Sequence, residues 1–260
     1  MTNLNKLGFC LSLLMGSLLS FPTPSIAGGN FQLSPNVVVL APSGQGAVES
    51  LFVASTGDEP VAVQIRMVKR EIDQDGTETN VEDDENFLVY PPQMIVAPGQ
   101  QQVVRVTWLG ETDLTEELAY RAVVEQVPVN LAPQQVQEVD GIPISITLTS
   151  TYIASVYIAP TGAKGNLILE GATSNKDNNG QTQLVLTFQN QGNARDYVGN
   201  VRQSLKLVSV DSPEKHVVIP GEKIQDERGT VILPGNKRRF VLPWPKELPV
   251  GPVTATFTTN

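Results

Sequence analysis

The chain has 260 residues, of which 27 are acidic and 18 are basic, so its net charge is −9. A surface of this charge repels nucleic acid and anionic membranes, and neither is expected as a partner. The single cysteine, Cys10, and the single histidine, His216, exclude metal sites built from several ligands of these two types.

Residues 1–27 have the pattern of a cleaved signal peptide. A lysine gives a positive start, residues 7–21 are apolar, and Ser25 and Ala27 place small side chains where signal peptidase reads the chain. Cleavage after Ala27 would export the protein and remove Cys10, which leaves a mature chain without thiols or disulfides. The apolar run is shorter than a typical membrane-spanning helix, and no later segment resembles such a helix, so no membrane insertion is expected.

After this segment, nearly every apolar run is short, alternates with polar residues and ends at turn residues, which is typical of β-strands. The pattern predicts seven strands, at 31–40, 47–55, 61–72, 87–90, 102–108, 119–129 and 142–158. Seven strands at such intervals indicate an immunoglobulin-like sandwich.

A linker is predicted next, because Pro160, Gly162 and Gly165 follow in close succession. A second series of strands is then predicted at 167–170, 182–189, 205–210, 216–219, 229–233, 238–242 and 253–258. The sequence therefore predicts an all-β protein with two immunoglobulin-like β-sandwich domains, residues 28–159 and 160–260.

Three polar loops could suggest particular chemistry, and two of them could hold a cation. Residues 73–76, DQDG, carry part of a calcium loop but lack the third acidic ligand and the closing glutamate, so a hairpin turn is the better interpretation. Residues 177–180, DNNG, have turn chemistry, and the acidic run at 82–85 is usual in solvated loops. No metal and no cofactor are therefore expected.

Nothing in the sequence predicts an enzyme. Any Ser-His arrangement would have to use His216, which we expect on the surface at the start of a strand. The Gly-x-Ser-x-Gly elbow and the phosphate-binding glycine loop with its lysine are both missing.

The most unusual stretch is 142–158, IPISITLTSTYIASVYI. Its even positions are apolar or small except at Ser150, and its odd positions are mostly Ser, Thr or Pro, which is the two-residue period of a strand. At about 3.3 Å per residue it would span roughly 56 Å, far more than an ordinary strand. Either part of its apolar face serves another chain, or the strand simply completes its own sheet.

Residues 87–106 resemble the first domain of the periplasmic pilus-assembly chaperones, the PapD-like family, through the Pro91-Pro92 step, the Pro98-Gly99 turn and the strand after it. The resemblance continues through the long strand and through two turns of the second domain, at 186–193 and 233–239. It implies an L-shaped or boomerang arrangement of the two domains. It also implies a chaperone in the periplasm that lends a strand to pilus, fimbrial or coat-like subunits and delivers them to an outer-membrane usher.

The family's roles fall on particular residues of this chain. Its donated strand matches Ile142, Ile144, Ile146 and Leu148. An internal ion pair near the domain junction would join an inward-facing Arg105 to Glu117, and Pro91 lies where a cis bond often occurs in such proteins.

Three positions depart from the family pattern. The family commonly grips the terminal carboxylate of the subunit with an arginine in the first strand and a lysine in the seventh, whereas this chain has Val37 and Ser155 there, or Ile153 in a shifted alignment. Val123 stands where the sixth strand typically has asparagine. These departures indicate a divergent branch.

One alternative belongs to a different class: a secreted two-domain immunoglobulin-like binding or adhesion protein without chaperone activity. A chaperone should co-purify with a small β-rich subunit in a one-to-one complex. An adhesion module should remain alone.

Overall fold

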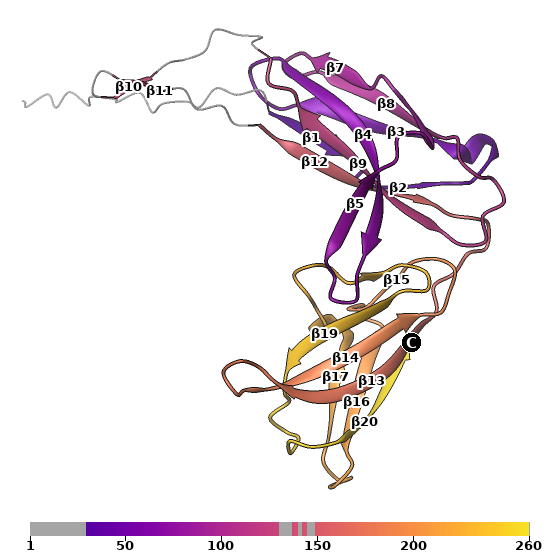
Figure 1. Ribbon diagram of the computed structural model, residues 1–260, viewed down its shortest axis with the longest axis vertical. Helices are drawn as coiled ribbons and strands as arrows, with labels where there is room; N and C mark the ends of the chain where they lie inside the picture. The colour runs from indigo at the N-terminus through magenta and orange to yellow at the C-terminus, as the bar shows by residue number, and fades with distance from the viewer. Residues whose placement is uncertain (1–29, 130–136, 140–141, 145–148, 260) are drawn as a thin grey trace, which may run out of the picture.

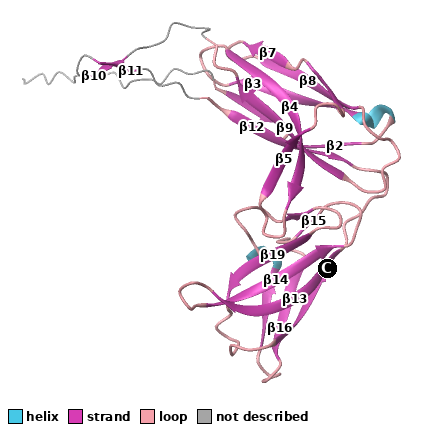
Figure 2. Ribbon diagram, in the orientation of Figure 1, coloured by secondary structure: helices cyan, strands magenta, loops and turns pink. Residues whose placement is uncertain are grey.

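The computed structural model describes residues 30–129, 137–139, 142–144 and 149–259. They form two β-sandwiches set at an angle to each other, like the arms of an open L (Figure 1). Within these residues the helical elements are two short 3-10 turns, η1 (Gly44–Ala47) and η2 (Gly221–Lys223) (Figure 2). The predicted all-β class with two immunoglobulin-like domains is confirmed. In the described ranges no helix has the length and apolar character to cross a membrane.

The first sandwich has two sheets. One has the strand order β1-β3-β8-β6, with β1 (Phe31–Ser34), β3 (Val48–Ser55), β8 (Gln101–Trp108) and β6 (Phe87–Tyr90). The other has the order β2-β12-β9-β4-β5, with β2 (Val37–Leu40), β12 (Thr151–Ile158), β9 (Leu118–Gln126), β4 (Val61–Ile72) and β5 (Glu78–Glu82), while β7 (Gln93–Val96) also pairs with β4. β12 runs parallel to β2 and antiparallel to β9.

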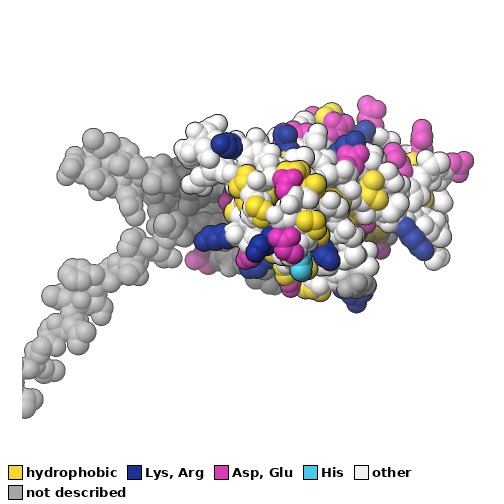
Figure 3. Space-filling view, turned by 90° about the horizontal axis from the view of Figure 1, so that it is seen from below, with side chains coloured by type: hydrophobic (Ala, Val, Ile, Leu, Met, Phe, Trp, Pro, Cys, Tyr) yellow, Lys and Arg dark blue, Asp and Glu magenta, His cyan; other side chains and the backbone are white. Residues whose placement is uncertain are grey.

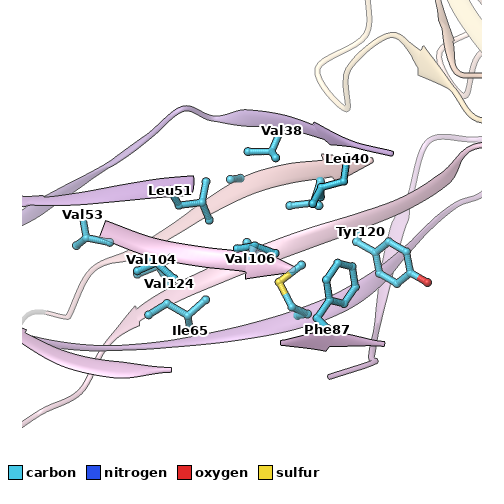
Figure 4. Packing of buried hydrophobic residues seen from close by; sticks show 14 of the residues in the cluster. Val38, Leu40, Leu51, Val53, Ile65, Phe87, Val104, Val106, Tyr120 and Val124 are labelled. Carbon is cyan, nitrogen blue, oxygen red and sulfur yellow. The ribbon is translucent and has the colours of Figure 1, made fainter. Parts of the chain in front are cut away.

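Alternate side chains of both sheets fill the core between them, as the two-residue period of a strand requires. Figure 4 shows this packing, to which Val38, Leu40, Leu51, Val53, Ile65, Val104, Val106 and Val124 contribute. At one end of the core the ring of Phe87 packs edge-on against Trp108 and Tyr120, with centroids 5.1 and 4.9 Å away. Such pairs stabilise beyond their buried area by about 0.5–1.5 kcal/mol.

The second sandwich is built in the same way. Its sheets are β13-β14-β19, with β13 (Leu167–Lys176), β14 (Thr182–Asn190) and β19 (Lys237–Pro243), and β17-β16-β20, with β17 (His216–Pro220), β16 (Gln203–Ser209) and β20 (Val253–Thr259). A two-stranded piece, β15 (Asp196–Tyr197) with β18 (Val231–Ile232), lies beside them. Phe188 packs between Phe240 and Phe257 in the core.

His216 is the exposed first residue of β17, as predicted. Figure 3 views the molecule from this end, where basic, acidic and apolar side chains are interspersed around the histidine. The end of the second domain thus has the mixed character of an ordinary solvated surface.

Two predicted strands are divided in the structure. The strand predicted at 31–40 breaks at a cis Ser34–Pro35 bond, and β1 and β2 join different sheets. This break has a physical reason, since proline has no N–H for a strand ladder.

The strand predicted at 142–158 is also not continuous, because β12 begins at Thr151 and residues 149–150 are not in a strand. Pairing with β9 ends where Thr151 faces Glu125, and the last bond of this ladder joins the N–H of Gln126 to the Ser150 carbonyl. Further upstream, β11 (Ile142–Ile144) pairs with β10 (Gln137–Val139) instead. Apolar and polar residues still alternate in the sequence upstream of Thr151, but the partner strand β9 has ended at Gln126.

Candidate functional site

The candidate site lies around β12 and on the face of its sheet that points away from the core. Ala154, Val156 and Ile158 point into the core of the first sandwich. Because neighbouring residues of a strand face opposite sides, Ile153 and Ser155 belong to the outer face. Ile153 is 50% exposed there.

The start of β12 has an open edge. Parallel pairing with β2 begins only where Ser155 faces Val37, and the N–H of Ser155 donates to the carbonyl of Asn36. On this side, residues 151–154 pair with no strand within the described part of the chain. An edge of this kind leaves backbone groups available for another strand.

The four residues predicted to be donated lie upstream of this edge. Ile142 and Ile144 are in β11, opposite Val139 and Gln137 of β10. Ile146 and Leu148 fall outside the described residues. Their assignment as donor residues therefore stays a prediction.

Apolar side chains cover the outer face on the side of β2. Val37 and Val39 of β2 are about as exposed as Ile153, at 45% and 46%. Val123 faces Ile153 from β9 and is buried. Val37, Val39, Ile153 and Val123 thus form an apolar strip, which includes the positions where the family pattern has Arg and Asn and, in the shifted alignment, Lys.

Next to this strip the same face carries a network of charged side chains. Arg121 of β9 donates from Nη1 to Ser155 Oγ at 2.5 Å and from Nε and Nη2 to Glu78 at 2.8 and 2.6 Å. Arg70 of β4 also donates to Glu78, at 2.8 Å, and to the hydroxyl of Tyr157 at 3.0 Å. Burial raises the pKa of Glu78, but the two arginines outweigh it, so the pKa lies below its ordinary value. Two cations share one carboxylate.

Arg121 and Arg70 are functional candidates that sequence reasoning missed. The strands containing Arg121 and Ser155 were both predicted, yet only the register of β9 against β12 sets these two residues opposite each other. That register could have been tested by matching the core-facing residues of the two strands. The face therefore has positive charge beside Ser155, although it comes from neighbouring strands.

The structure corrects the predicted Arg105–Glu117 ion pair. Arg105 is exposed on β8 because Val104 and Val106, its neighbours, occupy the inward positions. Glu117, whose side chain is only 3% exposed, forms its ion pair with Arg195 of the second domain and also accepts the Arg195 backbone N–H at 3.0 Å. Burial raises the pKa of Glu117 against the opposing effect of Arg195. This residue joins the domains.

The peptide bond between Tyr90 and Pro91 is cis. Residues 73–76 form the turn between β4 and β5, as predicted, with Asp73 accepting backbone N–H groups of the turn. Within the described ranges, no three His, Cys, Asp or Glu side chains come together as metal ligands would.

Residues 31–151 match a family model described as the pili and flagellar-assembly chaperone, PapD N-terminal domain. A comparison with curated proteins finds no similar sequence. The matched region covers most of the first sandwich and ends at Thr151, the first residue of β12.

Several solved structures resemble nearly the whole chain. A chaperone–tip adhesin complex of CFA/I fimbriae biogenesis has a TM-score of 0.52 at 18% identity, covering 88% of this chain and 98% of that one. The class 5 fimbriae chaperone CfaA has a TM-score of 0.51 at 17% identity, with 89% and 100% covered. The CsuC–CsuE chaperone–tip adhesion subunit pre-assembly complex of archaic Csu pili from Acinetobacter baumannii has 0.51 at 16% identity, with 84% and 89% covered.

At these identities the structural likeness concerns the fold, which is the same pair of sandwiches. The family model adds the sequence pattern of the first domain. Residues 31–151 therefore belong to the PapD N-terminal domain family of pilus-assembly chaperones, within a chain that has the two-sandwich fold of fimbrial chaperones.

Proposed function

We propose that this protein is a periplasmic chaperone that binds pilus, fimbrial or coat-like subunits by donor-strand complementation through residues 142–158 and delivers them to an outer-membrane usher. It works by binding, without catalysis and without a cofactor. One observation carries the proposal. The alternating apolar pattern continues upstream of Thr151, where pairing of β12 with both of its neighbours has ended.

The physical reason is that a subunit lacking its last strand exposes an apolar groove and an edge of unpaired amides, which aggregate. An added strand pairs with those amides and fills the groove with alternate side chains. Four such residues, Ile142, Ile144, Ile146 and Leu148, would contribute about 6–12 kcal/mol before the costs of ordering are subtracted. Such a complex is stable enough to protect a subunit.

The terminal carboxylate of a subunit would pair with Arg121 and Arg70. Val37 and Ser155 carry no charge, whereas the two arginines lie on the same face and share only Glu78. In this chain the cations that bind the carboxylate would therefore come from β9 and β4, in place of the family's usual pair of basic residues.

Residues 1–27 would act as the signal peptide, residues 28–159 as the first domain and residues 160–260 as the second. Mass spectrometry of the protein from a periplasmic extract would give the mature N-terminus expected at Gly28.

The experiment that tests the function compares two double variants by co-expression with a subunit from the same bacterium. Ile144→Asp with Ile146→Asp should leave a folded chaperone that no longer co-purifies with the subunit, because charge is placed on the apolar positions. Ser145→Asp with Thr147→Asp adds the same charge at the odd positions and should retain most binding. Equal subunit yield with both variants would refute donation, and a chain that never retains a subunit would favour an adhesion module.

A further inference from the structure

The β4–β5 hairpin reaches from the first domain to the second (Figure 1). Its turn is held by its own residues: Asp73 Oδ1 accepts the N–H groups of Asp75 and Thr77 at 2.9 and 2.8 Å, and the Gly76 N–H donates to the Asp73 carbonyl. Gly76 has a φ of 83°, which favours glycine. The shape of the tip is therefore set by residues of the turn itself.

Hydrogen bonds from the second domain converge on this tip. The backbone N–H of Arg239 donates to the carbonyl of Gln74 at 2.7 Å, and Asn236 Nδ2 donates to the carbonyl of Ile72 at 3.1 Å. Arg239 Nε also donates to Asp75 Oδ1 at 2.8 Å. Both backbone acceptors lie in or next to the turn, so the contact depends on the hairpin's shape as well as on charge.

The bond to Gln74 is made at the edge of a sheet. β19 is the last strand of the order β13-β14-β19, and Arg239 lies in its middle. An edge strand presents unpaired N–H groups on its outer side. The hairpin tip thus caps part of an edge that would otherwise face solvent.

Beneath the tip lies Arg238, which is only 1% exposed. Its Nη2 donates to Asp226 Oδ2 at 3.1 Å and to the Gly229 carbonyl at 3.0 Å, while Nε and Nη1 have no hydrogen-bonding partner among the described residues. Burial lowers the pKa of this guanidinium, and Asp226 opposes the effect. A cation is therefore sealed at the domain junction.

Gly76 packs directly against the guanidinium of Arg238. A Cβ atom at position 76 would come within 1.3 Å of Arg238 Nη1, so the hairpin can dock only with glycine at this position unless the arginine moves. Ile72, at the base of the turn, packs against a buried apolar cluster of Ala119, Tyr157, Val231 and Leu233.

We infer that the β4–β5 hairpin is a strut that fixes the angle between the two domains, and that Gly76 is the positioning residue that lets it dock on Arg238. Together with the Glu117–Arg195 pair and the linker, the strut attaches the second domain at a further point, which opposes rotation about the linker. This inference stands without the proposed function. Where that function holds, the strut also sets the space between the domains beside the subunit-binding face.

The chain offers a matched control, because residues 177–180 form a turn with the same geometry whose Gly180 has nothing within 4 Å. Spin labels at the exposed positions Gln102 and Lys206, one in each domain, would report the interdomain distance in a chain with Cys10→Ser. Gly180→Ala should keep the single narrow distance distribution of the parent. Gly76→Ala should broaden it and abolish the hydrogen-exchange protection of the Arg239 amide.

A second variant separates the contact from general instability. Adding Arg238→Ser to Gly76→Ala removes the clash and should restore the narrow distribution and most of the Arg239 protection. A folded Gly76→Ala protein with an unchanged distribution and an unchanged Arg239 amide would overturn the strut. Failure of Arg238→Ser to restore docking would overturn the role of the Gly76–Arg238 contact. Subunit binding is measured separately, so its absence affects only the proposed function.

Discussion

The turns at residues 73–76 and 177–180 have nearly the same sequence and nearly the same local geometry. Each begins with an aspartate whose Oδ1 accepts two backbone N–H groups, at 2.9 and 2.8 Å in both turns. Each ends with a glycine of positive φ, 83° at Gly76 and 77° at Gly180. Short-range chemistry alone therefore determines the shape of both turns.

Their surroundings differ completely. Gly180 faces open space, whereas Gly76 lies directly over the buried guanidinium of Arg238. One turn merely reverses the chain, and the other joins two domains. The role of a turn is therefore set by what packs against it, which its own four residues do not reveal.

The turn at residues 73–76 is called the docked turn below, and the turn at residues 177–180 the free turn. The largest expected effect comes from removing Asp226, the carboxylate that pairs with Arg238 beneath the docked turn. Asp226→Ala leaves the side chain of Arg238, 2% exposed, with the Gly229 carbonyl as its one acceptor among the described residues. We expect a loss of about 2–3 kcal/mol, below the 3–5 kcal/mol of a fully buried pair because Asp226 keeps contact with water. Urea unfolding would measure it.

The matched variant is Glu227→Ala, which removes the next carboxylate along the chain. Glu227 is exposed and should change stability by no more than about 0.5 kcal/mol. If the two variants had equal effects, Arg238 would not depend on Asp226, and the two turns would differ less than the structure indicates.

The strands of both domains could be predicted from the sequence because their core-facing side chains alternate with polar ones. β5 could not, since its sequence ETNVE has no apolar alternation. It becomes a strand because the turn at residues 73–76 folds the chain back onto β4. Likewise, the end of β12 at Thr151 depends on where β9 stops, and no local pattern contains that information.

The candidate site was predictable only in part. The apolar character of Val37 and Ile153 is visible in the sequence, and so is the alternation from Ile142 onward. The partner of Glu117 was not, because Arg195 lies 78 residues away in the other domain and the two meet only when the domains dock. Side-chain pairs across domains depend on a geometry that strand periodicity does not encode.

A smaller effect is expected from acid titration of the docked turn. Hydrogen bonds from the backbone of Thr77 and Asp75 lower the pKa of Asp73 below its ordinary value. A carboxylate with a lowered folded-state pKa stabilises the protein fully above the unfolded pKa of about 3.9, and this contribution is lost as pH falls through the folded pKa.

Asp73→Asn keeps a hydrogen-bond acceptor but removes the charge. The free energy of unfolding of this variant should therefore fall less steeply than that of the parent as the pH is lowered below about 4. Urea unfolding at a series of acidic pH values would show the difference, and Asp177→Asn would be measured beside it as the matched variant in the other turn. An Asp73→Asn protein with the parent's acid dependence would contradict the assignment of this titration to Asp73.

The smallest effect should come from making the docked turn resemble the free one at its third residue. Asp75→Asn introduces the residue found at Asn179 and removes the ion pair with Arg239, whose two side chains are 44% and 51% exposed. Exposed ion pairs contribute little, so we expect the free energy of unfolding to fall by at most about 0.5 kcal/mol at low salt. This loss should disappear near 1 M salt, where the Debye screening length is only about 3 Å. The Arg239 amide should remain protected, because its acceptor is the Gln74 carbonyl. If Asp75→Asn undocked the hairpin as fully as Gly76→Ala, charge rather than the fit of glycine over Arg238 would distinguish the two turns.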